Sequence, residues 1–219
     1  DPDVRVQLRL RNERVTVSLD AAGDSLHARG WRTDSGPAPL RETLAAGMLR
    51  LAGWEPSMPL IDPLCGSGTI GIEGALIATR CAPGLERTFG FERWPGQRPS
   101  MMAAIREEAR GMLSAPPAEI ICSDQDRSVL RIARDNAARA AIDHVVAFHA
   151  ADARKISAPP GPVGLVAMNP PYGERLGEVE ALVPFYQQIR EMLRHGFRGW
   201  RVAILIAHEA HRDALDLPD

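Results

Sequence analysis

The sequence is poor in several features that mark large classes of protein. Its only lysine is Lys155, so nearly all of its 26 basic side chains are arginines. The net charge is -2 and the pI is about 6.3. These values exclude the strong overall positive field of a general nucleic-acid binder. A local arginine cluster can still bind phosphate.

Cysteines and long apolar runs are also scarce. Cys65, Cys81 and Cys122 are the only cysteines, and they form no C-x-x-C pair. This pattern argues against a disulfide framework or a zinc site, so we expect a cytoplasmic protein with no bound metal. No apolar run is long enough to cross a bilayer and no signal peptide is evident, so no membrane association is expected.

The residues that are present predict one α/β domain with a small addition. The 219 residues are 45% hydrophobic and 25% charged, which is typical of a globular domain. Apolar and polar residues alternate over 4–11 and 15–19, which predicts a half-buried β-hairpin. We therefore expect residues 1–36 to form a β-rich appendage and residues 37–219 to form the main domain.

Three large side chains follow the hairpin closely in sequence: Arg29, Trp31 and Arg32. Arginines beside an aromatic ring can hold the RNA backbone and stack on its bases. An edge strand with its arginines in solvent would show the same pattern. Both interpretations stay open.

The main domain alternates between predicted strands and helices. Leu40, Leu44, Met48 and Leu51 predict an amphipathic helix over 40–53 that packs on the core through this stripe. Further helices are predicted at 69–80, 99–113, 127–140 and 182–193, with strands at 60–62, 119–123, 145–148, 163–168 and 202–206 and a short helix near the end. Such alternation predicts a doubly wound, mostly parallel sheet.

Polar side chains follow four of the predicted strands. Asp62, Asp124, Asp152 and Asn169 each stand at the carboxyl end of a strand. Doubly wound sheets bind ligands at this edge, near the point where the strand order reverses. The sequence therefore predicts a ligand site that these four positions share.

A glycine-rich loop connects the first of these strands to its helix. Gly66, Gly68 and Gly71 match G-x-G-x-x-G, which by itself is a weak signal. Glycines at these positions let a ligand approach the backbone closely at a helix N-terminus. A dinucleotide site would place an acidic residue about 20 residues later, but the next strand end is Asp124. Asp124 is suited to a ribose diol, or it could cap the following helix, as Asp126 is expected to do.

The segment Asn169-Pro170-Pro171-Tyr172 directly follows a predicted buried strand. Its two prolines make it rigid. The Asn169 side-chain oxygen and the Pro170 carbonyl can accept hydrogen bonds, and Tyr172 can stack on a ring. This combination suits a planar group that carries an amine. A proline-rich turn with a structural tyrosine is the alternative interpretation.

Together these motifs carry a family resemblance. Asp62–Thr69, Ser123–Asp126, Ala151–Ala153 and Asn169–Tyr172 resemble the class I S-adenosylmethionine-dependent methyltransferases that modify amino groups. Asn169–Leu176, Ala38–Ala45 and Ala82–Arg87 are similar to the THUMP-associated RNA guanine-N2 methyltransferases. The resemblance implies that the protein methylates a guanosine of rRNA or tRNA, with S-adenosylmethionine as cofactor.

The resemblance also implies roles for individual residues. The catalytic residues would be Asn169, Pro170, Pro171 and Tyr172. The cofactor would be bound by Leu40, Thr43, Asp62, Leu64, Gly66, Ser67, Gly68, Thr69, Asp124, Gln125, Asp152, Ala153 and Asn169. Apart from the resemblance, their residue types make Arg29, Trp31 and Arg32 candidate contacts to substrate RNA. Glu174 and Arg175 could contact the guanine edge or an RNA phosphate, or they could form a surface ion pair with each other.

Two elements of that family are not found in the sequence. No THUMP domain, which helps to hold RNA, precedes the appendage. No antiparallel hairpin follows the last predicted strand before Asp219. We therefore expect this chain to be the catalytic part of such an enzyme, with its RNA-holding domain missing.

Three other functions remain as alternatives. The same Asn-Pro-Pro-Tyr segment would serve methylation of adenine N6 in DNA or RNA, or of a protein glutamine amide. A second alternative is an RNA-binding module without catalysis. The third is a nicotinamide dehydrogenase, which the late acidic residue disfavours, and neither His144 nor His149 is marked as a hydride-relay base.

Overall fold

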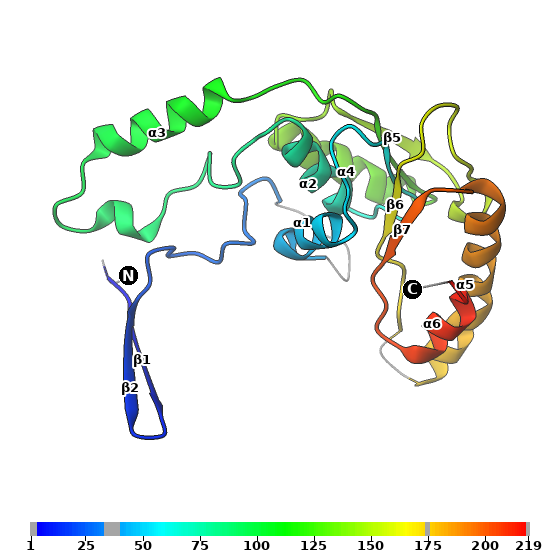
Figure 1. The fold of residues 1–219 in the computed structure, drawn as a ribbon, viewed down its shortest axis with the longest axis horizontal. Helices are drawn as coiled ribbons and strands as arrows, with labels where there is room; N and C mark the ends of the chain where they lie inside the picture. Colours follow the sequence, from blue (N-terminus) through cyan, green and yellow to red (C-terminus); the bar gives the residue numbers. More distant parts are fainter. Residues whose placement is uncertain (1–3, 33–39, 174–175, 218–219) are drawn as a thin grey trace.

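The core of the domain is a five-stranded parallel sheet (Figure 1). The computed structural model describes residues 4–32, 40–173 and 176–217. The strand order is β5-β4-β3-β6-β7 and every pair is parallel, which confirms the predicted doubly wound architecture. The strands are β3 (Leu60–Asp62), β4 (Ile120–Asp124), β5 (Val146–Ala150), β6 (Leu165–Met168) and β7 (Arg201–Ile204).

Helices cover both faces of this sheet. One hydrophobic cluster joins the sheet to α1 (Glu42–Leu51), α2 (Thr69–Ala78) and α4 (Arg127–Arg139). A second cluster joins the opposite face to α5 (Leu176–Gly196) and α6 (Glu209–Leu215). Successive residues of β6 enter the two clusters in turn, so this strand is buried on both sides, as expected for a parallel sheet.

Helix α2 lies very close to the sheet because two of its residues lack a side chain. A Cβ atom at Gly71 would overlap the Cys122 sulfur of β4, and one at Gly74 would overlap the Leu60 side chain of β3. Almost the whole surface of α2 is buried. The close packing fixes the start of this helix against the carboxyl ends of β3 and β4.

The predicted apolar stripe of α1 is confirmed for Leu40 and Met48, which pack in the core, but it is wrong for Leu44 and Leu51, which are 47% and 92% exposed. Within the helix, Glu42, Ala45 and Leu49 are buried. The helix is rotated because the Glu42 carboxylate faces inward to an arginine partner, 3.2 Å from Arg32 Nε. A buried charge of this kind is invisible to a pattern of apolar residues.

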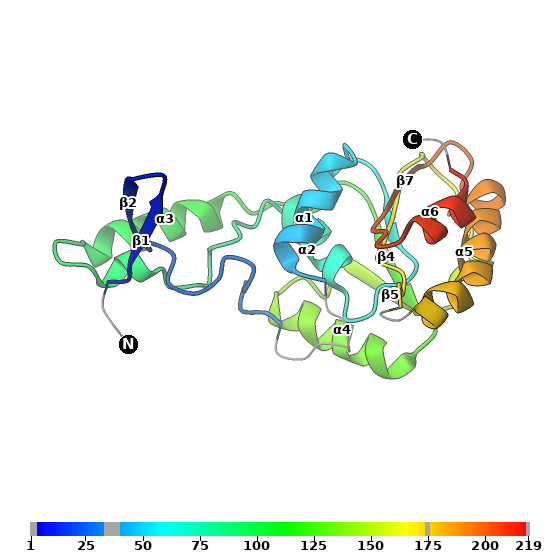
Figure 2. The ribbon, with the colours of Figure 1, turned by 90° about the horizontal axis from the view of Figure 1, so that it is seen from below.

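The expected hairpin forms, but it is not half-buried. β1 (Val6–Arg11) and β2 (Arg14–Leu19) pair antiparallel, and every residue of both strands is exposed. The hairpin projects from the side of the molecule that lies away from the sheet, and α3 (Pro99–Gly111) lies on that side too (Figures 1 and 2). No described element packs on either face of the hairpin. The prediction of a half-buried hairpin failed because it takes alternating apolar and polar residues as a sign that another layer covers the apolar face.

The described ranges show neither a membrane span nor a metal cluster. No helix there is both long enough and apolar enough to cross a bilayer. No group of three His, Cys, Asp or Glu side chains there is arranged to hold a metal ion.

Two glycine substitutions should have opposite effects on stability. Gly71→Ala forces a methyl group into the Cys122 sulfur, so we expect the free energy of unfolding to fall by about 1–3 kcal/mol. Gly47→Ala lies in α1 with no atom within 4 Å of the new Cβ, so we expect a gain of about 0.5–1 kcal/mol from helix propensity. Urea denaturation of both variants measures this. Equal effects would contradict the packing described for α2.

Candidate active site

A pocket opens at the carboxyl ends of β3, β4 and β6, where the strand order reverses. Its volume is about 370 Å³, within the range of small-molecule sites. A wider depression of about 890 Å³ lies beside the C-terminal half of α5, away from these strand ends. We place the site in the smaller pocket because the predicted polar side chains meet there. It is lined by Leu40, Asp62, Leu64, Cys65, Gly66, Ser67, Thr69, Ile70, Asp124, Gln125, Val129, Asn169, Pro171 and Phe185.

The glycine loop forms one wall of the pocket through its backbone. Gly66 and Gly68 have φ of 52° and 88°, in the left-handed region that favours glycine. The Cys65 amide donates to the Ser123 carbonyl (2.9 Å), which ties the loop to the end of β4. Gly68 then starts α2, whose first backbone N–H groups stand at this edge of the sheet.

Asp124 connects this loop to the next strand end. One of its carboxylate oxygens accepts from the Gly66 amide and the other from the Asp126 amide, both at 3.0 Å. Each oxygen keeps a further lone pair for a ligand hydroxyl. Asp126 caps α4 by accepting from the Ser128 amide (2.8 Å), which confirms the predicted cap.

Asp62 forms the floor of the pocket and is almost completely buried, at 1% exposure. Burial raises the pKa of its carboxyl group to about 8, and the nearby Asp124 charge adds to this effect, while a hydrogen bond from the Leu64 amide (3.2 Å) opposes it. In the absence of a cation, the Asp62 side chain is therefore mainly protonated at neutral pH. A cationic ligand group beside it would favour the charged form.

Asn169 stands at the end of β6 and brings an unsatisfied acceptor to the pocket. Its side-chain oxygen Oδ1 is buried and has no hydrogen-bond partner among the described residues. A buried acceptor without a partner costs about 1–3 kcal/mol. An unpaired amide oxygen beside a cavity is thus an arrangement that a donor group on a ligand would complete.

Side chains from α5 and from the start of α6 support the Asn-Pro-Pro-Tyr segment, and the sequence analysis did not single them out. The Tyr186 hydroxyl of α5 donates to the Pro171 carbonyl (3.0 Å), and the ring stacks on His211 of α6 with centroids 4.1 Å apart. The His208 ring nitrogen Nε2 contacts the Gly173 carbonyl at 3.2 Å and must carry the hydrogen, because a carbonyl only accepts.

These supports are buried, and their chemistry explains why they are stable. Tyr186 and His211 are both 0% exposed. Burial raises the Tyr186 pKa to about 12, so its hydroxyl remains a donor throughout the physiological range. The short C-terminal helix was expected only as a helical piece. Nothing in the sequence distinguishes His211 from the other polar residues of this helix, which also carries Glu209, Arg212 and Asp213.

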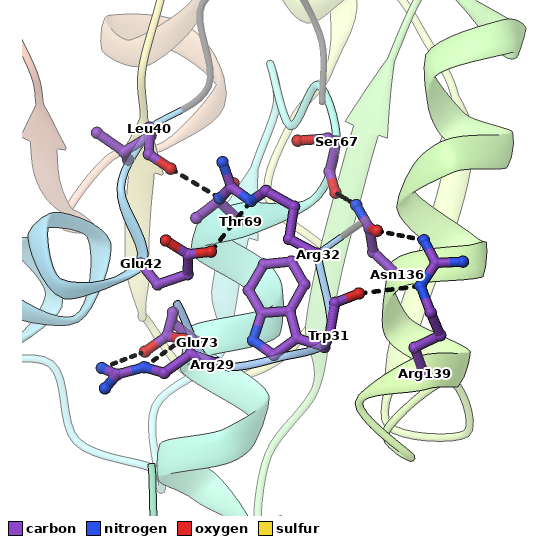
Figure 3. Close-up of polar contacts among 10 residues, drawn as sticks. All are labelled: Arg29, Trp31, Arg32, Leu40, Glu42, Ser67, Thr69, Glu73, Asn136 and Arg139. Carbon is purple, nitrogen blue, oxygen red and sulfur yellow. Dashed lines mark hydrogen bonds and ion pairs between the residues drawn. The ribbon is translucent and has the colours of Figure 1, made fainter. Parts of the chain in front are cut away.

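The predicted RNA contacts of Arg29, Trp31 and Arg32 are corrected by the structure, which turns these side chains inward (Figure 3). Trp31 is 4% exposed and cannot stack on a base. Arg29 forms an ion pair with Glu73 of α2 at 3.3 Å. The Glu73 pKa is raised by burial, and this arginine partly opposes the shift. The segment that carries these residues therefore braces the domain.

Arg32 connects two walls of the pocket. Its guanidinium donates to the Leu40 carbonyl and to the Thr69 hydroxyl, both at 2.7 Å, in addition to its ion pair with Glu42. Leu40 and Thr69 both line the pocket. This arginine thus holds the segment before α1 against the start of α2, as Figure 3 shows.

A second set of contacts in Figure 3 fixes the glycine loop from α4. The buried Asn136 amide donates to the Ser67 carbonyl (3.0 Å), and Arg139 donates to the Asn136 side-chain oxygen (2.6 Å) and to the Trp31 carbonyl (3.0 Å). The glycine loop, α4 and the segment that carries Trp31 are therefore joined by hydrogen bonds.

Several predicted site residues lie outside the pocket lining. Thr43 is exposed on α1, and Ala153 is in the core. Asp152 forms an ion pair with Arg154 at 2.8 Å, which lowers its pKa to about 2. Gly68, Pro170 and Tyr172 adjoin lining residues without lining the pocket themselves. Glu174 and Arg175 lie outside the described residues.

The high pKa of Asp62 predicts a pH-dependent stability. Between about pH 4 and pH 8 the unfolded chain releases this proton while the folded protein keeps it, so folding is progressively disfavoured as the pH rises, by up to about 1.4 kcal/mol per pH unit. Asp62→Asn has no charge in either state. Urea denaturation at pH 5 and pH 8 should therefore show the variant gaining stability relative to the wild type at pH 8. A difference that stays constant with pH would contradict the assignment.

Comparison with known proteins is consistent with this geometry. The family model of the RMKL-like methyltransferase domain matches residues 29–218. The "Ribosomal RNA large subunit methyltransferase K/L" of Methylococcus capsulatus is 46% identical over 217 residues, covering 93% of this chain and 29% of the relative. The protein of the same name from Pseudoalteromonas atlantica is 40% identical, covering 95% and 30%. The chain spans about 30% of the length of these relatives.

Solved structures share the fold along nearly the whole chain. One from Listeria monocytogenes, named as a predicted N6-adenine-specific DNA methylase, is 34% identical with a TM-score of 0.89 and covers 97% of this chain and 56% of that one. SMU.472, complexed with SAH, is 31% identical with a TM-score of 0.88 and covers 97% and 55%. Since the family model covers most of its length, this chain belongs to the RMKL-like methyltransferase domain family.

Proposed function

We propose that this domain transfers a methyl group from S-adenosylmethionine to the exocyclic N2 amine of a guanosine in large-subunit ribosomal RNA. The observation that carries the proposal is the buried, unpaired Oδ1 of Asn169 at the edge of a pocket formed by strand ends. A planar amine supplies the N–H donor that this oxygen lacks. The pocket supplies space for the second reactant.

The donor set of the pocket suits S-adenosylmethionine. The free lone pairs of Asp124 would bind the ribose hydroxyls, with Gln125 beside the adenine. Asp62 and the N-terminus of α2 would bind the ammonium and carboxylate of the methionine part. When bound, S-adenosylmethionine supplies an electrophilic methyl group on a positively charged sulfur.

The Asn-Pro-Pro-Tyr segment would prepare the amine for attack. An exocyclic amine is a weak nucleophile because its lone pair is delocalised into the ring. Hydrogen bonds from its two N–H groups to Asn169 Oδ1 and the Pro170 carbonyl would favour a tetrahedral nitrogen whose lone pair points at the methyl group. Catalysis would then consist mostly of positioning and electrostatics. The described lining residues include no histidine or lysine to act as a base, so the proton would leave late, to solvent or through Asn169 or Pro170.

The RNA substrate is inferred from the relatives. Both curated relatives are named ribosomal RNA large subunit methyltransferases, and the guanine N2 target follows from the family resemblance of Asn169–Leu176. A base inside an RNA helix would have to be turned out to reach the pocket. Tyr172, partly exposed beside the lining, would stack on it, which contributes about 1–3 kcal/mol.

Adenine N6 is the second candidate target. The Listeria structure, 34% identical to this chain, carries the name of an N6-adenine-specific DNA methylase. The adenine amine is also planar and would make the same two hydrogen bonds. The two candidates therefore differ in the base, and share the cofactor and the role of Asn169.

Asn169→Ala tests the acceptor directly. Removing the amide oxygen should abolish methyl transfer to RNA, because the amine is no longer aimed at the methyl group. The affinity for S-adenosylmethionine, measured by calorimetry, should change only a few-fold. Tritium transfer from labelled cofactor to ribosomal RNA measures the activity. Activity within about twofold of wild type would rule out this role.

Tyr186→Phe tests the support below the segment. The variant keeps the ring stacked on His211 but leaves the Pro171 carbonyl unpaired, so we expect kcat to fall about tenfold, with cofactor affinity unchanged. Trp54→Phe is the matched control, since it removes a ring N–H bond to the Met58 carbonyl (3.0 Å) away from the pocket. The control should lose stability but keep kcat. A kcat unaffected by Tyr186→Phe, or equal losses in both variants, would contradict a positioning role.

A further inference from the structure

The exposed hairpin has two faces of opposite chemistry. The register pairs Val6 with Leu19, Leu8 with Val17 and Leu10 with Val15, which puts six aliphatic side chains on one face. The other face carries Gln7, Arg9, Arg11, Arg14, Thr16 and Ser18. We call this second side the arginine face. It contains no acidic residue.

The three arginines of this face have no ion-pair partner in the described chain. Arg5, just before β1, differs because it pairs with Asp20 (3.5 Å). Arg11 and Arg14 stand directly opposite each other in the register. Like charges at such positions repel and destabilise a hairpin. An anion placed between them would remove this cost.

The hairpin is fixed to the domain at its base. The Gly90 and Phe91 amides donate to the Ala22 and Ala21 carbonyls at 3.1 and 3.0 Å. Arg87 donates to the Asp24 carbonyl at 2.7 Å. Gly23 and Gly90 approach so closely that a Cβ on Gly23 would lie 3.2 Å from the Gly90 nitrogen. These contacts join the base of the hairpin to residues 87–91 of the main domain.

We propose that the arginine face binds the phosphate backbone of the substrate RNA, at a distance from the pocket. The inference rests on the proposed function, since it takes RNA as the substrate. The net charge of the chain is -2, so its overall field does not attract RNA and a local cluster of positive charge is needed. Between Val6 and Leu19 there are three arginines and one glutamate, so the positive charge is local. Arginine is the side chain best matched to phosphate.

RNA fits this face better than an acidic protein segment does. Arg9 and Arg11 are two residues apart on one strand, about 6–7 Å, and Arg14 lies across from Arg11. A continuous polyanion can contact all three in succession. The face has no aromatic side chain and few other groups that could read bases. The contact should therefore depend strongly on salt and little on sequence.

The triple variant Arg9→Gln/Arg11→Gln/Arg14→Gln tests the proposal. Binding of the 219-residue chain to a fluorescein-labelled RNA stem-loop is measured by anisotropy over a range of KCl concentrations. The slope of log Kd against log salt should fall by about 2–3, with an affinity loss of about tenfold or more at low salt. Cofactor affinity should stay unchanged, because the hairpin contacts no residue of the pocket.

Arg50→Gln/Arg80→Gln/Arg198→Gln is the matched control. These exposed arginines have no ion pair in the part of the chain that the structure describes. Their replacement removes three positive charges, as the hairpin variant does. The control should keep most of the slope. Equal losses in both triple variants would overturn the proposal, since only net charge would then matter. An unchanged slope in the hairpin variant would also overturn it.

Crosslinking gives a readout that does not depend on the stability of the variants. Benzoylphenylalanine at Thr16, on the arginine face, should crosslink to the RNA, whereas the same group at Val17, on the aliphatic face, should not. A Thr16 crosslink only to protein, or none, would reject RNA as the partner. If the Thr16 crosslink to RNA fails while methyl transfer is normal, only the inference about the arginine face is refuted. If methyl transfer is absent while the hairpin variant lowers the slope of log Kd against log salt as expected, only the proposed function is refuted.

Discussion

The reversal of strand order between β3 and β6 is the constraint on which the site depends. The chain leaves β3 through α2 on one face of the sheet and leaves β6 towards α5 on the other. The two strand ends are adjacent, but their following loops diverge and leave a pocket between them. Asp62 and Asn169 occupy these two ends, so one pocket receives an acidic floor and an amide acceptor.

Buried polar contacts hold the walls of this pocket apart. Arg32 bridges the Leu40 segment to α2, and Asn136 secures the glycine loop to α4. On the other side, Tyr186 and His208 hold the carbonyls of the Asn-Pro-Pro-Tyr segment and of Gly173. Because these groups are mostly buried, loss of one partner would leave another unsatisfied. The buried polar groups around the pocket therefore also hold its walls in place.

Sequence patterns predicted the sheet and most of the pocket for identifiable reasons. Parallel strands are short apolar runs, and their carboxyl ends meet at one edge, so Asp62, Asp124 and Asn169 could be brought together from spacing alone. The errors concern partners. The alternation over 4–19 suggested a covering layer, and the arginines near Trp31 suggested solvent. Glu73 is 44 residues from Arg29, and Glu42 meets Arg32 only through the fold of the segment before α1, so neither ion pair could be read from the sequence. Tyr186 and His211 meet only because α5 and α6 pack together.

The proposed reaction brings an exocyclic amine of guanine to a methyl donor at the end of β6. The most direct test incubates the protein with large-subunit ribosomal RNA from cells that lack it and with methyl-labelled S-adenosylmethionine. The RNA is then digested to nucleosides and analysed by mass spectrometry. The account predicts labelled N2-methylguanosine as the product. Labelled N6-methyladenosine, or label recovered only in protein, would contradict it.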